Sequence, residues 1–268
     1  MAVETVASDR RCRLAGEVYN RRVLDTTHPE RPTPDGPVNL RGPVLAQIGE
    51  LGSDYHEWVH RPIRVPSGVR IFRSDRLERL SRNPWWVVPL IWAPVVAALA
   101  ISSIVQGVSY PALGPRLIGG LIVWMVIEYV LHRFVFHYRP RSAAARRVHF
   151  LLHGVHHLVP EDPRRLVFPP VPAAIIAATL FGAVRLLLPL PDTCAVMAGL
   201  LTGYISYDLI HYYVHHGRPR SRVGRFLQRY HLMHHFTDPT RMFGVSQPLL
   251  DLLGGTFGPR TRRPGRAP

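Results

Sequence analysis

The 268-residue sequence lacks lysine entirely and contains only two cysteines. Cys12 and Cys194 are far apart and belong to no C-x-x-C pair, which argues against a disulfide framework or a cysteine-type zinc site. The N-terminus is polar and charged and has no apolar run of signal-peptide length. Acidic residues are also scarce, with 18 Asp and Glu against 33 basic residues and a net charge of +15.

An excess of arginine is typical of proteins that bind nucleic acid or acidic lipid headgroups, and of membrane proteins whose cytoplasmic loops are positively charged. No nucleic-acid recognition motif accompanies the arginines, so the first interpretation has no support. We expect no nucleic-acid partner.

Apolar residues make up 47% of the chain and are gathered into four blocks. Each block is close to the ~20 residues that cross a hydrocarbon core of ~30 Å. The alternative, four buried helices of a soluble protein, would require one short chain to enclose them all. The sequence therefore predicts four membrane-spanning helices. They cover residues 84–106, 115–136, 167–190 and 193–214.

The arginines are distributed unevenly between the links that join these helices. The short links at 107–116 and 191–192 together hold one arginine, Arg116, whereas the N-terminal region, the 137–166 link and the C-terminal tail hold almost all the others. By the positive-inside rule, both termini and the 137–166 link are predicted to be cytoplasmic. Residues 75–82 are predicted to form a short amphipathic helix at the membrane surface, and residues 29–43 are predicted to be extended because proline recurs there.

Histidine is abundant: twelve of the 15 histidines lie between His132 and His235. Ten of these twelve form four clusters, at the ends of the second and fourth apolar blocks and in the polar regions that follow them. The predicted topology brings all four clusters to the cytoplasmic side at one membrane depth. The cluster members are His132, His137, His153, His156, His157, His211, His215, His231, His234 and His235.

The spacing within the clusters is suited to metal binding. Residues at i, i+3 and i+4 share a helix face, so His153, His156 and His157 are expected to point at one centre, and the H-x-x-H-H at 231–235 repeats the pattern. His132 and His137 would diverge by about 140° on a straight helix, so the helix must end or bend there. Ten histidines exceed the usual four ligands of one tetrahedral metal, and two metals with open positions fit better. Spacing alone does not choose among zinc, iron, copper and nickel.

Several polar residues near the clusters are candidates for orienting the ligands, because a metal-bound imidazole needs a partner for its second nitrogen. Asp208, with Tyr207 and Tyr204 nearby, precedes His211 by one turn, and Glu128 precedes His132 by one turn. We expect the remaining histidines to bind no metal directly. These are His149 and His216 beside the clusters, and His28, His56 and His60 in the N-terminal segment.

The histidine motifs resemble those of the fatty acid hydroxylase/sterol desaturase superfamily. Sequences around the first apolar block and the LVFPPVP stretch are most similar to the fatty acid 2-hydroxylases that act on sphingolipid acyl chains. The resemblance covers roughly residues 40–257. Its motifs are GPVLAQIGELGSDYHEWVHRPI, LSRNPWWVVPLIWAPVV, HRFVFH, HFLLHGVHHLVPEDPRRLVFPPVP, YDLIHYYVHHG, YHLMHHF and FGVSQPLLDLLGGT.

The resemblance implies an all-α integral membrane fold with four transmembrane helices and a cytoplasmic, histidine-rich helical cap that holds a dimetal site. Residues 1–82 would pack on the cap, residues 83–257 would form the membrane hydroxylase domain, and residues 258–268 would be a disordered basic tail. The ten histidines above would be the ligands, and Tyr207 and Asp208 match functionally important positions. The implied location is the bacterial inner membrane or the endoplasmic reticulum.

The implied reaction is the oxygen-dependent 2-hydroxylation of a sphingolipid or ceramide acyl chain, with iron as the active metal and zinc as a possible bound species. Family members often carry a cytochrome b-type domain, for which the first 40 residues are too short, so a separate reductase or electron-transfer protein is expected. Arg146, Arg147, Arg164 and Arg165 could hold a lipid headgroup or contact lipid phosphates.

Other interpretations remain open at this level. Within the superfamily they are sterol or carotenoid oxidation, desaturation and alkylglycerol cleavage. Outside it, a non-enzymatic metal-binding protein or transporter is the main alternative, but a transporter should carry polar ligands near the bilayer midplane. Here the first and third apolar blocks carry none.

Overall fold

The computed structural model describes residues 38–40, 42–65 and 68–260. His28, most of the predicted extended segment 29–43 and most of the tail 258–268 lie outside these residues. The described residues form helices and turns, without a β-strand. The shorter helical elements are α2 (Val44–Ile48), η1 (Gly49–Asp54), α3 (Tyr55–Val59), α4 (Asp75–Leu80), η2 (Leu131–Phe136), α7 (Ala143–His149), η3 (Phe150–Gly154), α8 (Val155–Leu158), α11 (Arg222–Phe236) and α12 (Leu249–Leu253).

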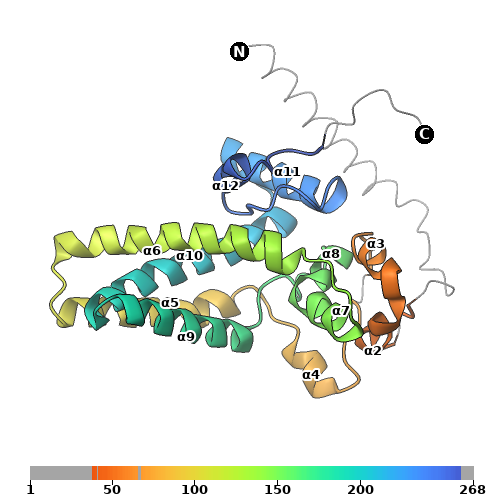
Figure 1. The fold of residues 1–268 in the computed structure, drawn as a ribbon, viewed down its shortest axis with the longest axis horizontal. Helices are drawn as coiled ribbons and strands as arrows, with labels where there is room; N and C mark the ends of the chain where they lie inside the picture. Colours follow the sequence, from red (N-terminus) through yellow and green to blue (C-terminus); the bar gives the residue numbers. More distant parts are fainter. Residues whose placement is uncertain (1–37, 41, 66–67, 261–268) are drawn as a thin grey trace, which may run out of the picture.

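Four long helices are apolar enough to cross a membrane, which confirms the predicted spans. They are α5 (Val87–Val105), α6 (Tyr110–Val130) continued by η2, α9 (Pro170–Leu187) and α10 (Leu190–His216). α6 and α10 begin earlier than predicted, because proline is accommodated in the first turn of each helix. The four helices lie together at one end of the molecule, and the cap formed by α2–α4, α7 and α8 lies at the other (Figure 1).

The central helix of the bundle is α10, which packs against both α5 and α6. Its contact with α6 depends on glycine. A Cβ atom on Gly120 of α6 would lie 2.0 Å from the Val196 carbonyl oxygen, and one on Gly199 of α10 would lie 2.0 Å from the Leu117 carbonyl oxygen. Small residues let two backbones approach closely within a bilayer, where apolar burial alone does not drive helices together. This contact holds the ends of α6 and α10, with their histidines, in a fixed relation.

The N-terminal segment, residues 38–82, supplies α2–α4 of the cap and packs against α7, η3 and α8. Its Val44, Ile48 and Tyr55 share an apolar cluster with Phe150 and Leu158 of the cap helices. The backbone N–H of Ile63 donates to the Leu158 carbonyl at 2.8 Å. The segment therefore contributes one wall of the structure around the histidines.

Arginine side chains hold this segment against the neighbouring helices. Arg146 Nη2 donates to the Gly49 carbonyl at 2.5 Å, and Arg147 Nε donates to the Leu45 carbonyl at 3.2 Å. Buried Arg165 forms an ion pair with Glu78 of α4. Burying a guanidinium is costly unless it has polar partners, and the buried side chains of Arg146 and Arg165 find theirs within the protein. Arg147 is exposed and makes a single such bond.

Candidate metal centre

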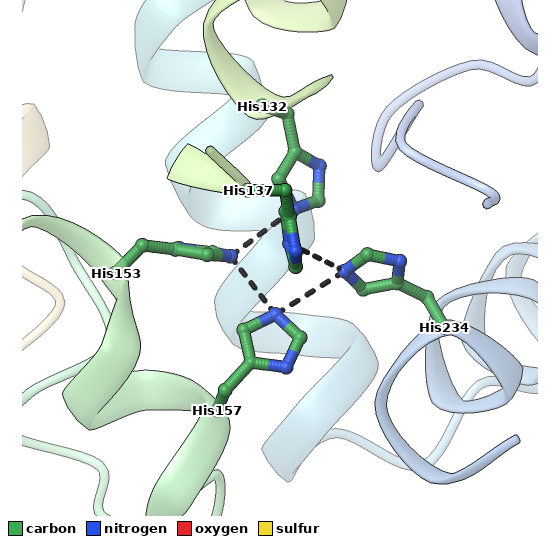
Figure 2. A group of neighbouring side chains, drawn as sticks. All are labelled: His132, His137, His153, His157 and His234. Carbon is green, nitrogen blue, oxygen red and sulfur yellow. Dashed lines mark hydrogen bonds between the residues drawn. The ribbon is translucent and has the colours of Figure 1, made fainter. Parts of the chain in front are cut away.

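The first group of histidines brings together five ring nitrogens from four helical segments (Figure 2). The Nε2 atom of His153 lies 3.1 Å from the Nε2 atoms of both His132 and His157. The Nε2 atom of His234 lies 3.0 Å from that of His137 and 3.2 Å from that of His157. All five rings point inward, so their nitrogens surround one point.

The second group consists of His156, His211, His215, His231 and His235. The Nε2 atom of His231 is at its centre, 3.0 Å from those of His211 and His235 and 2.9 Å from that of His215. The two groups touch, because the rings of His157 and His235 stack with centroids 4.2 Å apart. All ten sequence-predicted ligand candidates therefore lie in one of two adjoining groups.

The H-x-x-H-H motifs are divided between the groups, which corrects the expectation that each motif faces one centre. His153 and His157 lie in the first group and His156 in the second, whereas His231 and His235 lie in the second and His234 in the first. The reason is geometric. On a helix, i+4 lies about 40° to one side of i, and i+3 lies about 60° to the other side. Each motif thus contributes histidines to both groups.

The five-residue spacing of His132 and His137 is accommodated by a change of helix type. α6 continues into the π-helical turn η2, which ends at His137 with φ −109° and ψ 18°. In a π-helix residue i bonds residue i+5, so residues five apart are one turn apart. The predicted bend therefore takes the form of a widened turn that brings both rings to the same side.

The nitrogen spacing fits metal coordination. For a metal–nitrogen distance of ~2.1 Å, two ligands at right angles have nitrogens about 3.0 Å apart, as observed in both groups. Burial, together with neighbouring histidines, lowers the pKa of His156, His157 and His231 well below its ordinary value of 6.5. Neutral imidazoles have a lone pair to donate, so these residues fit a bound transition metal.

A short loop, residues 241–246, orients two histidines of the first group. His234 Nδ1 donates to the Arg241 carbonyl at 2.6 Å, and His132 Nδ1 donates to the Phe243 carbonyl. A carbonyl only accepts, so each Nδ1 carries the proton and each Nε2 is left free to bind a metal. Met242 between them is fully buried with φ 61°. This left-handed conformation is strained for a non-glycine residue and persists only where its surroundings enforce it.

Two buried carboxylates hold this loop. Asp251 of α12 accepts from the backbone N–H groups of Phe243 at 2.9 Å and Gly244 at 2.7 Å. Glu128 of α6 accepts from those of Val245 and Ser246, each at 2.8 Å. Glu128 was expected to bond a ligand directly, but it acts on His132 only through the loop. Asp251 was missed by the sequence analysis, although a carboxylate within the apolar run PLLDLL was a usable signal.

The side of the first group that faces the helical bundle is aromatic. The Phe136 ring stacks on the His153 ring at 5.0 Å, and the Phe168 ring lies 6.4 Å from that of Phe136. Asp208 Oδ2 accepts from the Phe168 backbone N–H at 3.3 Å. We expected Asp208 to orient His211, but within the described residues its carboxylate fixes this aromatic side instead. Tyr207 is buried with its ring 5.6 Å from that of His211.

The remaining described histidines lie outside both groups. His149 Nδ1 is 2.7 Å from the Tyr55 hydroxyl, and the His216 ring lies against Tyr212. His60 is closer to the site than expected, because its ring centroid lies 5.0 Å from that of His157. Its i, i+4 pairing with His56 is the sequence signal that could have marked it.

Comparison with known proteins assigns this arrangement to a family. The sequence model for the fatty acid hydroxylase family matches residues 117–256, which contain all ten grouped histidines. The chain belongs to the fatty acid hydroxylase family. The family resemblance inferred from the motifs is therefore confirmed.

Individual relatives agree with this assignment. Dihydroceramide fatty acyl 2-hydroxylase FAH2 of Arabidopsis thaliana is 42% identical over 82% of this chain and 93% of that protein. Fatty acid 2-hydroxylase of Homo sapiens is 38% identical over 83% of this chain and 65% of that protein. The solved structure titled full length scs7p, in which only the hydroxylase domain is visible, has a TM-score of 0.79 and 36% identity, covering 84% of this chain and 88% of that one.

Replacing Asp251 by Asn should weaken metal binding without unfolding the protein. An amide has one acceptor oxygen in place of two, so the bonds that hold Phe243 and Gly244 cannot all form, and the support of His132 loosens. Loss of such a partner typically costs about 10–100-fold in metal affinity, which competition with a graded chelator measures.

The matched control is Asp192→Asn, which removes a carboxylate paired with Arg116 at the opposite end of the spans. It should leave the chelator titration unchanged. Equal metal affinity in the Asp251 variant and the wild type would show that the loop does not support the ligands.

Proposed function

We propose that this protein is a membrane-bound fatty acid 2-hydroxylase that acts on the acyl chain of a sphingolipid or ceramide at a dimetal centre. The observation that carries the proposal is the position of the two histidine groups, at the cap-side ends of the membrane helices with an aromatic side toward the apolar layer. A lipid can place its headgroup in water there while its chain stays apolar. The names of the relatives support hydroxylation at C2.

The ten grouped histidines are the proposed ligands, five for each of two metals. Iron is proposed as the active metal, and zinc as a species that the same nitrogens also bind. When bound, iron supplies the redox chemistry that activates dioxygen. A metal transporter fits less well, because the ligands gather at one end of the spans and not near the midplane.

The net reaction converts the acyl CH2 at C2, dioxygen, two electrons and two protons into the CHOH group and water. The chain's own residues bind and orient the substrate. Phe136 and Phe168 provide an apolar surface beside His153, and Asp208 holds Phe168 in place. Tyr207 and Asp208 are therefore proposed as positioning residues for the reaction. The two electrons are proposed to come from a separate electron-transfer protein.

The metal proposal predicts that each histidine group loses its metal separately. Wild-type protein should bind two equivalents of metal. His234→Ala should release one equivalent from the first group, and His156→Ala one from the second, at a chelator concentration that the wild type withstands. Elemental analysis of the purified proteins measures this.

Asp208→Asn serves as the matched control, since its carboxylate lies outside both groups, and it should retain two equivalents while losing most turnover. Wild-type protein that is active with one equivalent or less would refute the dinuclear assignment.

The reaction itself is tested with isotopically labelled dioxygen. Membranes that contain the protein, supplied with an electron donor, should yield acyl chains labelled at C2, because one oxygen atom of the product derives from dioxygen. Mass spectrometry of the extracted lipids locates the label. Label at another carbon would indicate a sister reaction, such as sterol or carotenoid oxidation. Oxygen derived from water would reject the hydroxylase mechanism.

The cap is proposed to face the cytoplasm of a bacterial cell, or the cytoplasmic side of the endoplasmic reticulum. The arginines of the cap and the lack of arginine in the link between α5 and α6 (residues 106–109) support this orientation. Cysteines introduced at positions 141 and 107 should react with an impermeant reagent from opposite sides of sealed vesicles. Labelling of both from one side would contradict the topology.

A further inference from the structure

We propose that α12 is an interfacial helix whose outer face reaches the acyl chains at their boundary with the headgroups, so that lipid contact holds the ligand-orienting loop 241–246 in place. This inference concerns a segment outside the four spans. It does not depend on which reaction the metal centre performs.

The inner side of α12 is fixed to the protein by polar bonds. Asp251 is fully buried and bonds the loop at Phe243 and Gly244, and its Oδ1 also accepts from the Thr256 hydroxyl at 2.7 Å. The chain after the helix is held by α6. The Tyr129 and Thr256 hydroxyls are 2.9 Å apart, and Arg133 Nη1 donates to the Gly254 carbonyl at 3.1 Å.

The outer side of α12 is apolar and exposed. Leu252 and Leu253 are 63% and 74% exposed, and Leu249 and Phe257 beside them are also exposed. Asp251 and its bonds hold one side of this short helix to the protein, and the exposed leucines make the other side apolar. A helix that lies in the membrane interface turns such an apolar face toward the acyl chains.

The place where α12 is attached to the Tyr110–Phe136 span determines how deep its apolar face lies in the bilayer. Tyr129 and Arg133 lie in the last two turns of the Tyr110–Phe136 span. Next to them, Val126, Val130 and Phe134 form an exposed apolar stripe along α6 at i, i+4 and i+8. The apolar surface of α12 is thus continuous with the lipid-facing surface of a membrane helix.

The surroundings identify lipid as the occupant. Exposed Trp85 and Trp86 precede α5 and mark the same end of the spans, as expected for aromatic side chains at a membrane interface. Arg133 is next to α12 and can contact lipid phosphates. Figure 1 shows α12 beside α6, at the end of the bundle from which α9 starts.

This placement gives the bilayer a structural role at the metal centre. The helix that contacts lipid is the one whose Asp251 holds the loop, and the loop carbonyls fix the rings of His132 and His234. The outer leucines are therefore expected to act on ligand geometry from a distance.

Site-directed spin labelling in reconstituted bilayers tests the proposal. Leu253→Cys is labelled with a nitroxide in a background in which Cys12 and Cys194 are replaced, and relaxation by oxygen is compared with relaxation by a water-soluble nickel chelate. The lipid control is Ile175→Cys in α9, which is 64% exposed, and the water control is Ser53→Cys in η1, which is also exposed. Phe257→Cys provides a second reporter in case the first variant does not fold.

At position 253 we expect oxygen to relax the label more strongly than the nickel chelate does, as at position 175 and opposite to position 53. Behaviour like that of position 53 would place the helix in water and overturn the proposal. Protection from both reagents would show that protein, such as a second copy of the chain, covers the face, and would also overturn it.

Discussion

The rest of the structure depends on the crowding of ten imidazole rings, eight of them buried and two partly buried, in one small space. Burying a polar nitrogen without a partner costs on the order of 1–3 kcal/mol in proteins, and here many such nitrogens lie about 3 Å apart. A metal ion bound in each group, as proposed above, would supply the missing partner for the five Nε2 atoms of that group. Without a metal, the protein alone must hold the rings in place. Several hydrogen bonds and helix contacts of the surrounding fold do so.

These interactions lie at different distances from the histidine rings. At the closest range, the carbonyls of Arg241 and Phe243 fix the tautomers of two ligands. One step further out, Asp251 and Glu128 hold the loop that presents these carbonyls. Over the length of the bundle, the glycine contact between α6 and α10 sets the positions of both membrane helices that carry ligands. A small displacement at any of these levels changes nitrogen positions that coordination tolerates only within a few tenths of an ångström.

The sequence predicts the spans and the ligand candidates because both depend on local patterns: length and apolarity for the helices, and histidine spacing for the ligands. It could not predict which centre each histidine serves. His156 and His157 are adjacent in the chain, yet their assignment depends on where α10 and α11 lie relative to α8. Glu128 and Asp208 were misjudged for a related reason, since their partners at Val245 and Phe168 are backbone groups far away in sequence. The pattern of side chains in the sequence does not indicate which backbone groups a carboxylate will bond.

The division of each H-x-x-H-H motif between the groups has a further consequence for the centre as a whole. α8 and α11 each contribute to both groups, so neither helix can rotate to improve one group without disturbing the other. The stacked rings of His157 and His235, one from each group, add a direct contact between them. Two independent mononuclear sites would not need this arrangement. The proposed dimetal unit, in which both metals would act on one substrate, does need it, because the protein must then fix the distance between the metals. The shared helices provide that constraint through one residue in each motif, the histidine at i+3, which lies in the other group.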